Sequence, residues 1–313
     1  MTFDVLTPRP LGATGRLVTG LCVGTGEIGA MAVYGAPVPE PQAMATARRA
    51  FAGPLNFVDT SNGYGVSEGR LGVALAELGG VPEGLLLATK ADPVEGGPFD
   101  GARVLASARE SMDRLGLEHL PLLYLHDPER VSFEQAMAPG GPVAALRELV
   151  AEGLVSHIGV AGGPVELLRS FVATGSFQVV LTHNRWTLLD RSAEPLLEDC
   201  AAANVAVVNG APFGGGILAK GPALSPKYAY RAASPALLAA VSAMHAACER
   251  FAVPMAAVAL QCSLRESRIS STIVGMSRPE RYDEALALAA HPIPDDLWSE
   301  VEALTPGPEH WLR

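Results

Sequence analysis

Four ionisable residues near the ends of short apolar runs could carry acid–base chemistry. Asp59 follows Phe57-Val58, Tyr64 lies in the segment just beyond, and Lys90 and His126 each end a leucine-rich run. A free tyrosine has a pKa near ~10 and is a poor proton donor or acceptor at neutral pH, but a nearby ammonium favours its phenolate. A carboxylate would fix that ammonium, and an imidazole could hydrogen-bond a substrate oxygen. The set suits proton transfer to or from an alcohol or carbonyl oxygen, and the sequence suggests no metal cluster, nucleophile–base pair or carboxylate pair.

Each of these residues taken alone has a simpler structural explanation. Asp59 could cap or fix its own loop, and Tyr64 could pack with its hydroxyl in solvent. Lys90 could be a solvated cation at a strand end, and His126 could be a hydrogen-bonded histidine on a rim. Their joint placement on consecutive strands favours the chemical interpretation, because the side chains would then converge at one end of the fold.

The elements that position these residues alternate along the chain. Runs rich in leucine or β-branched residues predict eight strands, at 18–24, 56–60, 85–90, 120–126, 155–160, 177–182, 205–210 and 269–275. Segments rich in Ala, Leu, Arg and Glu predict eight helices, at 41–51, 67–78, 102–115, 143–152, 164–174, 193–203, 235–251 and 279–290. Most strand runs are apolar throughout, as expected of parallel strands covered on both faces.

Eight β/α units predict an α/β fold, a (β/α)8 or TIM barrel, with its active site at the C-terminal ends of the strands. No linker divides the sequence, so we expect one domain over residues 1–313. Segment 213–234 is too long for a plain connection, and we interpret it as a functional loop over one end of the barrel.

Composition excludes several classes of protein. Of the 313 residues, 49% are hydrophobic and 18% charged, which is a globular rather than a disordered mixture. Lys and Arg number 23 against 33 Asp and Glu, and a net charge of −10 argues against nucleic acid or anionic membrane as partners. Four scattered cysteines, a polar N-terminus and no long apolar run lead us to expect a cytoplasmic protein without an obligate protein partner.

Residues 24–29 match the dinucleotide-binding pattern G-x-G-x-x-G after a predicted strand. The context does not fit a Rossmann fold, since the next residues contain a glycine and three prolines where a helix should begin. The acidic residue Asp59 also follows about 30 rather than ~20 residues later. We interpret these glycines as letting a ligand approach the backbone at the end of the first barrel strand.

The segment 57–65 (FVDTSNGYG), followed by Ser67-Glu68 and Leu71-Gly72, resembles the D-T-x-x-x-Y-G…S-E…L-G signature of the aldo-keto reductases. The resemblance continues in PLGATG, VGTG, ATK, YLHDP, IGVAG and IVGMSRPER, and so covers nearly the whole chain. It implies that this protein is an NAD(P)-dependent enzyme that moves a hydride between nicotinamide C4 and a carbonyl carbon without a metal. It also implies a catalytic tetrad with Tyr64 as proton donor or acceptor, consisting of Asp59, Tyr64, Lys90 and His126.

The same resemblance implies where NAD or NADP would bind. The nicotinamide would lie in the barrel mouth, and the glycines of segment 211–216 could cradle the pyrophosphate through their N–H groups, although a flexible hinge is an alternative. The adenosine end would meet segment 275–281, at a helix N-terminus with two arginines. The residues implied as cofactor-binding are Gly24, Thr25, Gly26, Asp59, His183, Ala211, Pro212, Phe213, Gly215, Gly275, Ser277, Arg278 and Arg281.

Several positions depart from the family pattern. The usual Ser-Asn that grips the nicotinamide carboxamide is Ala161-Gly162, the usual Gln is His183, and the usual aromatic beneath the ring is Gly210. A lysine often found after the last strand is absent, although Arg278 and Arg281 could meet a 2′-phosphate. The motifs therefore do not separate NAD from NADP.

Segments 181–193 and 209–218 resemble the subgroup of D-threo-aldose 1-dehydrogenase (L-fucose or L-galactose dehydrogenase) and pyridoxal 4-dehydrogenase. This implies oxidation of a C1 hemiacetal to a lactone, with an aldose of the L-fucose, L-galactose or D-arabinose type as substrate. Alternatives are NADPH-dependent reduction of an aldehyde or ketone, pyridoxal 4-dehydrogenase activity and, more remotely, a non-catalytic cofactor-binding subunit. The residues expected to line the substrate site are Tyr34, His183, Asn184, Arg185 and Trp186, the last equally plausible as a core residue.

Overall fold

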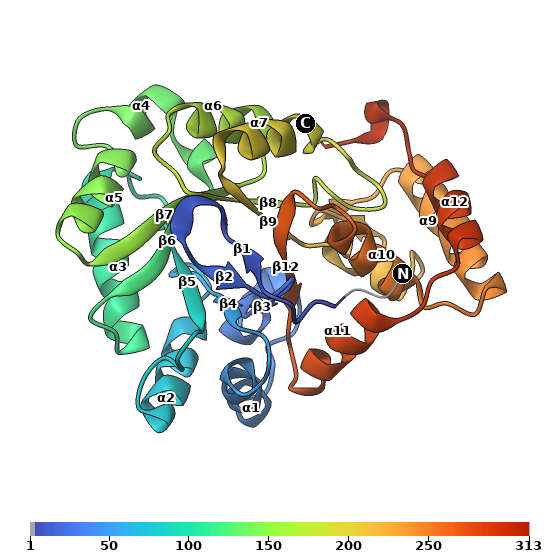
Figure 1. The fold of residues 1–313 in the computed structure, drawn as a ribbon, viewed down its shortest axis with the longest axis horizontal. Helices are drawn as coiled ribbons and strands as arrows, with labels where there is room; N and C mark the ends of the chain where they lie inside the picture. Colours follow the sequence, from blue (N-terminus) through green and yellow to red (C-terminus); the bar gives the residue numbers. More distant parts are fainter. Residues whose placement is uncertain (1–3, 313) are drawn as a thin grey trace.

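Eight parallel strands form the centre of the molecule, and the computed structural model describes residues 4–312 (Figure 1). The strands are β3 (Leu21–Gly24), β4 (Phe57–Asp59), β5 (Leu86–Ala91), β6 (Leu120–His126), β7 (Val155–Gly162), β8 (Val179–His183), β9 (Ala206–Gly210) and β12 (Ile269–Gly275). They pair in chain order, and β12 pairs with both β9 and β3, which closes the barrel. The predicted (β/α)8 barrel is confirmed.

Helices surround this barrel and cover the outer faces of its strands (Figure 1). The surrounding helices are α1 (Glu40–Phe51), α2 (Ser67–Leu78), α3 (Gly101–Leu115), α5 (Pro142–Ala151), α6 (Val165–Ala173), α7 (Glu194–Ala203), α10 (Met255–Leu264) and α11 (Glu280–Ala290). The additional helices are α4 (Phe133–Met137), α8 (Ile217–Lys220), α9 (Pro235–Arg250) and α12 (Asp295–Ala303). The short 3-10 helices are η1 (Gly12–Thr14), η2 (Gly26–Gly29), η3 (Ala32–Tyr34), η4 (Pro128–Arg130), η5 (Gly214–Gly216) and η6 (Pro308–His310).

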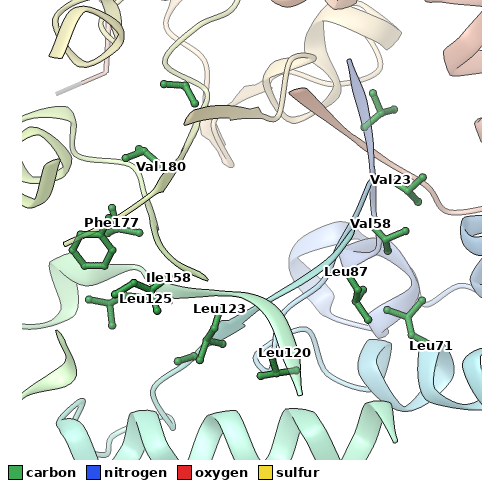
Figure 2. Packing of buried hydrophobic residues seen from close by; sticks show 14 of the residues in the cluster. Val23, Val58, Leu71, Leu87, Leu120, Leu123, Leu125, Ile158, Phe177 and Val180 are labelled. Carbon is green, nitrogen blue, oxygen red and sulfur yellow. The ribbon is translucent and has the colours of Figure 1, made fainter. Parts of the chain in front are cut away.

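Side chains alternate between two sides of the barrel wall, as they must along a strand. On β5, Leu86 and Ala88 belong to the cluster that fills the barrel interior, whereas Leu87 belongs to the layer between strands and helices. Figure 2 shows Leu87 and its neighbour Val58 pointing toward Leu71 of α2. The continuous apolar runs in the sequence therefore reflect two apolar environments, one on each side of the wall.

The N-terminal end of the barrel is covered by a hairpin of β1 (Arg9–Pro10) and β2 (Leu17–Val18). Leu11 and Val18 are buried with the barrel-interior cluster. The N–H of Ala13 donates to the carbonyl of Asn204 at 3.1 Å, which ties the hairpin to the loop before β9. The strand expected at 18–24 is thus divided between this hairpin and β3.

The connection between β9 and β12 differs from the expectation. The predicted helix at 235–251 exists as α9, but α9 lies outside and packs with α12, while α10 contacts β12 and α11 (Figure 1). Nearly every residue of α10 is buried, so the helix is apolar on all sides and lacks the periodicity that would reveal it. Within the described part of the chain no single helix is long and apolar enough to span a membrane; α9 and α10 pass that test only together and are bent by 105°.

Segment 211–234 contains η5, α8 and a second hairpin, made of β10 (Lys227–Tyr228) and β11 (Arg231–Ala232). The Tyr228 hydroxyl donates to the backbone carbonyl of Asn184 at 2.7 Å, which fastens this hairpin to the loop after β8. That loop follows the C-terminal end of a barrel strand, so the segment lies at the end of the barrel where the polar strand-end residues are found.

Candidate active site

Strand register brings three of the four tetrad candidates together. Phe57, Ala88 and Tyr124 point into the barrel interior, and the next inward position on each strand is Asp59, Lys90 and His126 respectively. Because β4, β5 and β6 are neighbours in the barrel, these three side chains leave the wall at adjacent points of one rim.

The Lys90 ammonium lies at the centre of this group. Its Nζ donates to Asp59 Oδ1 at 2.6 Å, to the Thr60 carbonyl at 2.7 Å and to the Tyr64 hydroxyl at 3.4 Å. An ammonium has three N–H donors, so these three acceptors use all of them. The structure thus brings the phenol of Tyr64 beside a fixed cation, as the chemical argument from the sequence requires.

The ion pair between Lys90 and Asp59 is buried, with the two side chains 1% and 4% exposed. Burial raises the pKa of Asp59, and the neighbouring Lys90 ammonium opposes that rise. Among residues 4–312, Asp59 Oδ2 has no hydrogen-bond partner. Breaking the pair by removing Lys90 would leave a buried carboxylate uncompensated, which is strongly destabilising.

His126 lies next to Tyr64, with the two rings edge to face and their centroids 5.9 Å apart. Its Nδ1 is 2.6 Å from Asp92 Oδ1, and its Nε2 is 3.7 Å from Asp127 Oδ1. Burial disfavours the charged ring, but the carboxylate of Asp92 and, to a smaller extent, that of Asp127 outweigh this effect, and the pKa of His126 is raised. The His126 side chain is 16% exposed, more than the 10% of its partner Asp92.

Asp92 was not recognised in the sequence, although it lies only two residues after Lys90. Its carboxylate accepts hydrogen bonds from Ser61 Oγ and from the Gly63 N–H at 2.7 Å, in addition to His126. Burial raises the pKa of Asp92, but His126 and these hydrogen bonds outweigh it and lower the pKa to about 2. The signal in the sequence is a carboxylate just after a strand end, and the family motif ATK stops at Lys90, two residues before it.

Two glycines hold the loop that carries Tyr64. A Cβ at Gly29 would overlap the Tyr64 carbonyl, and a Cβ at Gly65, which has φ +54°, would overlap the carbonyl of Gly29. The Val66 N–H also donates to the Gly29 carbonyl at 3.1 Å. The last glycine of the G-x-G-x-x-G segment therefore allows η2 to pack directly against the backbone of Tyr64.

Thr25, implied as a cofactor-binding residue, has a structural role in this loop. Its hydroxyl donates to the Asp59 carbonyl at 3.0 Å, and the Ser67 hydroxyl donates to the Thr25 carbonyl at 3.0 Å. Ser67 is the first residue of α2, and its hydroxyl is turned into these buried contacts instead of capping the helix. The strand end at Asp59 is thereby fixed to η2 on one side and α2 on the other.

Gly24 of β3 and Gly275 of β12 lie at the rim, and each is close to a neighbouring side chain. Gly24 pairs with Gly275, but a Cβ at Gly24 would lie 2.7 Å from Ile273 Cγ2. A Cβ at Gly275 would lie 2.7 Å from Glu27 Oε1, the end of a flexible side chain. The sequence predicts that Gly24 lets a ligand approach the backbone, but contact with Ile273 also explains why this position has no side chain. Gly26 lies in η2 directly before Glu27.

The departures at His183 and Gly210 are coupled. A Cβ at Gly210 would lie 3.3 Å from the Cβ of His183, so the histidine lies against the position where the family pattern has an aromatic side chain. Asn184 Nδ2 lies 3.0 Å from His183 Nδ1 and can donate to it, which leaves the proton of the neutral ring on Nε2. Burial lowers the pKa of His183 to about 4, so the ring is neutral at physiological pH.

The departure at Ala161-Gly162 also has a steric basis. A Cβ at Gly162 would lie 3.0 Å from Glu129 Oε2 and 3.0 Å from Pro128 Cδ. The connection after β6 therefore leaves little room for the asparagine of the family pattern at this position.

The glycine turn after β9 has a backbone that few other residues could adopt. Gly214, Gly215 and Gly216 have φ of 59°, 77° and 101°, and Ala211 before them has φ 54°. The turn is closed by hydrogen bonds from Gly214 N–H to the Ala211 carbonyl and from Gly216 N–H to the Phe213 carbonyl, both 2.9 Å. The exposed lysine of α8 follows this turn directly, with its Cδ 3.9 Å from the Cβ position of Gly216.

The two arginines expected at an adenosine site already have acidic partners on α11. Arg278 Nη1 and Nη2 contact the two carboxylate oxygens of Glu284 at 2.7 and 3.0 Å, and Glu280 lies 3.7 Å away. Arg281 Nη1 is 3.8 Å from Glu284 Oε2. The Ser277 carbonyl accepts a hydrogen bond from Gln42 Nε2 at 2.9 Å, which joins this loop to α1.

The residues expected to line a substrate site fall in different environments. Asn184 is buried with φ 58°, and its Oδ1 has no partner among the described residues. Trp186 belongs to the hydrophobic layer outside the barrel, with the guanidinium of Arg191 4.9 Å from its ring centroid, which agrees with the core interpretation. The side chain of Tyr34 lies outside the described residues.

The arrangement as a whole supplies a phenol, a fixed ammonium and an imidazole at one rim, which can move a proton to or from a single oxygen atom. In the described part of the chain no group of three or more His, Cys, Asp or Glu residues could hold a metal ion. The phenol, ammonium and imidazole at this rim therefore suit acid–base chemistry on a molecule that binds beside them.

Comparison with known proteins agrees with this chemistry. L-galactose dehydrogenase from Arabidopsis thaliana is 34% identical over 307 residues, covering 95% of this chain and 93% of that protein. D-threo-aldose 1-dehydrogenase from Pseudomonas sp is 33% identical over 205 residues, covering 65% and 62%. Pyridoxal 4-dehydrogenase from Microbacterium luteolum is 28% identical over 335 aligned positions, covering 94% and 96%. The subgroup of relatives expected from the sequence is confirmed.

A solved structure from Pseudomonas aeruginosa, described as an aldo-keto reductase, superimposes with a TM-score of 0.66 at 22% identity, covering 93% of this chain and 98% of that one. It shows the same fold. The profile of the Aldo/keto reductase family matches residues 20–306, the whole barrel from the first strand to beyond the last. Barrel, rim chemistry and sequence relationship lead to one conclusion: the chain belongs to the aldo/keto reductase family.

Proposed function

We propose that this enzyme oxidises the C1 hydroxyl of an aldose in its hemiacetal form to a lactone, with NAD or NADP as the hydride acceptor. The observation that carries the proposal is the position of the Tyr64 hydroxyl, 3.4 Å from the buried Lys90 ammonium and next to the His126 ring. The substrate class is supported by the relatives named L-galactose dehydrogenase and D-threo-aldose 1-dehydrogenase.

In this proposal the Tyr64 phenolate takes the proton of the C1 hydroxyl. Lys90 stabilises the phenolate, while Asp59 and the Thr60 carbonyl fix the ammonium in place. His126 hydrogen-bonds the reacting oxygen and orients it. A bound nicotinamide supplies the acceptor for the hydride that leaves C1. Asp59 and Lys90 are buried whereas Tyr64 and His126 are partly exposed, so the groups that would meet the substrate are the accessible ones.

Several features fit a dinucleotide cofactor at the same rim. The N–H groups of Gly214 and Gly216 donate within their own turn, so the exposed Lys220 beside that turn is the group that would meet an anionic pyrophosphate. The buried Asn184 Oδ1 lacks a partner among the described residues, and the neutral His183 next to it would carry a donor on Nε2. An amide group of a ligand could satisfy both.

We further propose that NAD is preferred over NADP. A 2′-phosphate would need an available cation at the adenosine end, but Arg278 is engaged by Glu284 through two contacts, and the same glutamate lies near Arg281. The carboxylate would repel a phosphate dianion, whereas it could accept hydrogen bonds from ribose hydroxyls.

We also propose that the enzyme acts in the cytoplasm on small molecules. All four cysteines are buried and free, which suits a reducing compartment. The net charge of −10 supports a ligand held by local groups and not by the overall field.

The test is a substrate panel with the purified protein, in which NADH or NADPH production is followed with L-fucose, L-galactose, D-arabinose and pyridoxal. The proposal expects the highest kcat/KM with an aldose. Turnover confined to pyridoxal, or a faster reverse reaction on aldehydes and ketones with NADPH, would replace it by the corresponding alternative. Cofactor binding without turnover of any substrate would indicate a non-catalytic subunit.

The acid–base assignment is tested by Tyr64→Phe, which removes one oxygen atom. We expect kcat to fall by about 10²–10⁴-fold, the usual effect of losing a general acid or base. Tyr282→Phe is the matched control, because Tyr282 is a buried phenol on α11 whose oxygen accepts a hydrogen bond from the Leu55 N–H. That variant should lose stability and keep kcat, and full activity in Tyr64→Phe would exclude Tyr64 as the acid–base.

A further inference from the structure

Asp92 is a buried carboxylate that the reaction described above does not use. Asp92 is 7% exposed and directly follows the last residue of β5. The backbone of Asp92 is held by α3, since its N–H donates to Ser107 Oγ at 3.0 Å and its carbonyl accepts from Arg103 Nε at 3.0 Å. The carboxylate is therefore presented to His126 by a rigid part of the barrel.

Three donors surround this carboxylate. His126 Nδ1 lies 2.6 Å from Oδ1, the Gly63 N–H lies 2.7 Å from Oδ2, and Ser61 Oγ also donates to Oδ2. Donors on both oxygens favour the ionised form, which accepts hydrogen bonds and donates none. The hydrogen between Asp92 and His126 must then belong to Nδ1 of the imidazole.

This fixes what the other ring nitrogen can do. A neutral imidazole with its hydrogen on Nδ1 has only a lone pair on Nε2, and it cannot donate to a substrate oxygen. A protonated imidazole donates from both nitrogens. His126 can therefore orient the reacting oxygen as a donor only when the ring carries a positive charge.

The charges that face His126 favour that state. Asp92 lies at Nδ1, and Asp127 of the following loop lies 3.7 Å from Nε2. The opposing cation is Lys90 on β5, which is itself paired with Asp59 on β4. Further titratable groups that interact with the ring are Glu129 of η4, Tyr64, which meets its edge, and the neutral His183 on β8.

We propose that Asp92 is a positioning residue that holds His126 as an imidazolium, with Nδ1–H bound to the carboxylate and Nε2–H directed to the reacting oxygen. The inference rests on the proposed function, because it assigns a charge to the group that orients the C1 oxygen. As the proton leaves that oxygen for Tyr64, negative charge develops on it, and a charged donor stabilises this charge more than a neutral one. The raised pKa of His126 agrees with the geometry.

The first experiment measures the charge of His126 in the free enzyme, without cofactor or substrate. Side-chain ¹⁵N resonances of the histidines are followed against pH, and His126 is assigned by the signal lost in His126→Gln. We expect both ring nitrogens to be protonated at pH 7, with a midpoint above the ordinary ~6.5. In Asp92→Asn the midpoint should fall by about one pH unit or more. An unchanged midpoint, or a neutral ring at pH 7 in the unaltered protein, overturns the inference.

Asp113→Asn serves as the charge-matched control, since Asp113 is an exposed residue on α3. It removes the same charge outside the site and should leave the His126 midpoint unchanged. Ser61→Ala removes one donor to Asp92 and keeps the carboxylate, so the His126 midpoint should stay above the ordinary ~6.5. If Asp92→Asn does not fold, a neutral His126 ring at pH 7 in the unaltered protein still overturns the inference.

The second experiment is the pH profile of kcat/KM for aldose oxidation. In the unaltered enzyme the rate should decline at alkaline pH as His126 loses its proton, and in Asp92→Asn this decline should begin about one unit lower, with kcat reduced about tenfold at pH 8 and KM changed less. An unshifted profile overturns the inference. A protein that oxidises no aldose but shows the ¹⁵N shift contradicts the proposed function alone, whereas an active enzyme without that shift contradicts the role of Asp92 alone.

Discussion

Two carboxylate–cation pairs flank the phenol of Tyr64. One is the pair of Lys90 and Asp59, whose side chains are 1% and 4% exposed, and the other is the pair of His126 and Asp92, whose side chains are 16% and 10% exposed. Each cation is oriented by its own carboxylate, so neither depends on the substrate for its position. Fixed charges of this kind stabilise a transition state without first having to reorganise.

His183 gives a prediction about stability against acid. Its pKa is about 4 in the folded protein, below the ordinary value of 6.5, because the ring is buried. The unfolded chain therefore takes up the proton first, so the stability due to the neutral ring is present above pH 6.5 and is lost as the pH falls toward 4. Between pH 7 and pH 4.5, the free energy of unfolding should fall by about 2–3 kcal/mol more in the unaltered protein than in His183→Gln.

Urea unfolding at the two pH values measures this difference. At pH 8 the imidazole is neutral in both the folded and the unfolded chain, so the two proteins then differ only by contributions that do not depend on pH. Equal losses of stability on acidification would show that the His183 ring is not held neutral by its surroundings.

Asp59, Lys90 and His126 could be predicted from the sequence, because an ionisable residue at the end of an apolar strand has no packing role that explains it. Asp92 could not be predicted as a partner of His126, since the contact depends on how the β5–α3 connection leaves the barrel. The coupling of Gly210 with His183 was also hidden, because the two residues are neighbours only across the pairing of β8 and β9.

At the level of elements, the loop of Tyr64 depends on close contact with η2. Gly29→Ala would place a methyl group against the Tyr64 carbonyl and displace the phenol from Lys90. A displacement of roughly 1 Å commonly costs about 10²-fold in rate, so kcat should fall by about that factor. Steady-state kinetics of the variant check this, together with its thermal unfolding.

Gly69→Ala is the matched control for this substitution. Gly69 lies on the exposed side of α2, and a Cβ there would meet no atom within 4 Å. Alanine should stabilise that helix by about 0.5–1 kcal/mol and leave kcat unchanged. If Gly29→Ala keeps full activity, η2 does not determine where Tyr64 lies.

The ion pair of α11 gives a prediction about cofactor selection. Glu284→Ala releases the guanidinium of Arg278 and removes a carboxylate that would repel a 2′-phosphate. We expect the Kd for NADP to fall about tenfold, with little change for NAD. Quenching of protein fluorescence by each dinucleotide measures this, with Glu302→Ala, an exposed glutamate on α12, as the control. An equal change for both cofactors would show that the pair does not discriminate.

The elements themselves were predicted to different degrees. The strands at 120–126 and 269–275 and the helix at 67–78 have the predicted bounds, because apolar runs and helix-ending glycines mark them. The helix that contacts β12 was missed, since α10 is buried on all sides and resembles an apolar run without period. The hairpin of β10 and β11 was missed because its turn uses Ala229 and Tyr230 with φ of 49° and 67°, where glycine would have been the signal.

For the whole molecule, we expect the N-terminal hairpin to contribute to folding stability and not to catalysis. Leu11 is 1% exposed and belongs to the barrel-interior cluster, at the end of the barrel opposite the tetrad. Leu11→Ala should lower the free energy of unfolding by about 2–5 kcal/mol and leave kcat/KM unchanged. Leu17 of the same hairpin is 55% exposed, so Leu17→Ala should change stability by less than about 0.5 kcal/mol. Equal effects on urea unfolding would mean that the hairpin does not complete the core.

Closure of the barrel also has a consequence for synthesis on the ribosome. Val23 of β3 pairs with Val274 of β12, which come from opposite ends of the sequence. A nascent chain must keep the edge of its first barrel strand unsatisfied until its last strand has emerged from the exit tunnel. Chains that terminate early, before β12, would present two open edges and a hydrophobic interior, and we expect such fragments to aggregate or be degraded instead of folding into a smaller barrel.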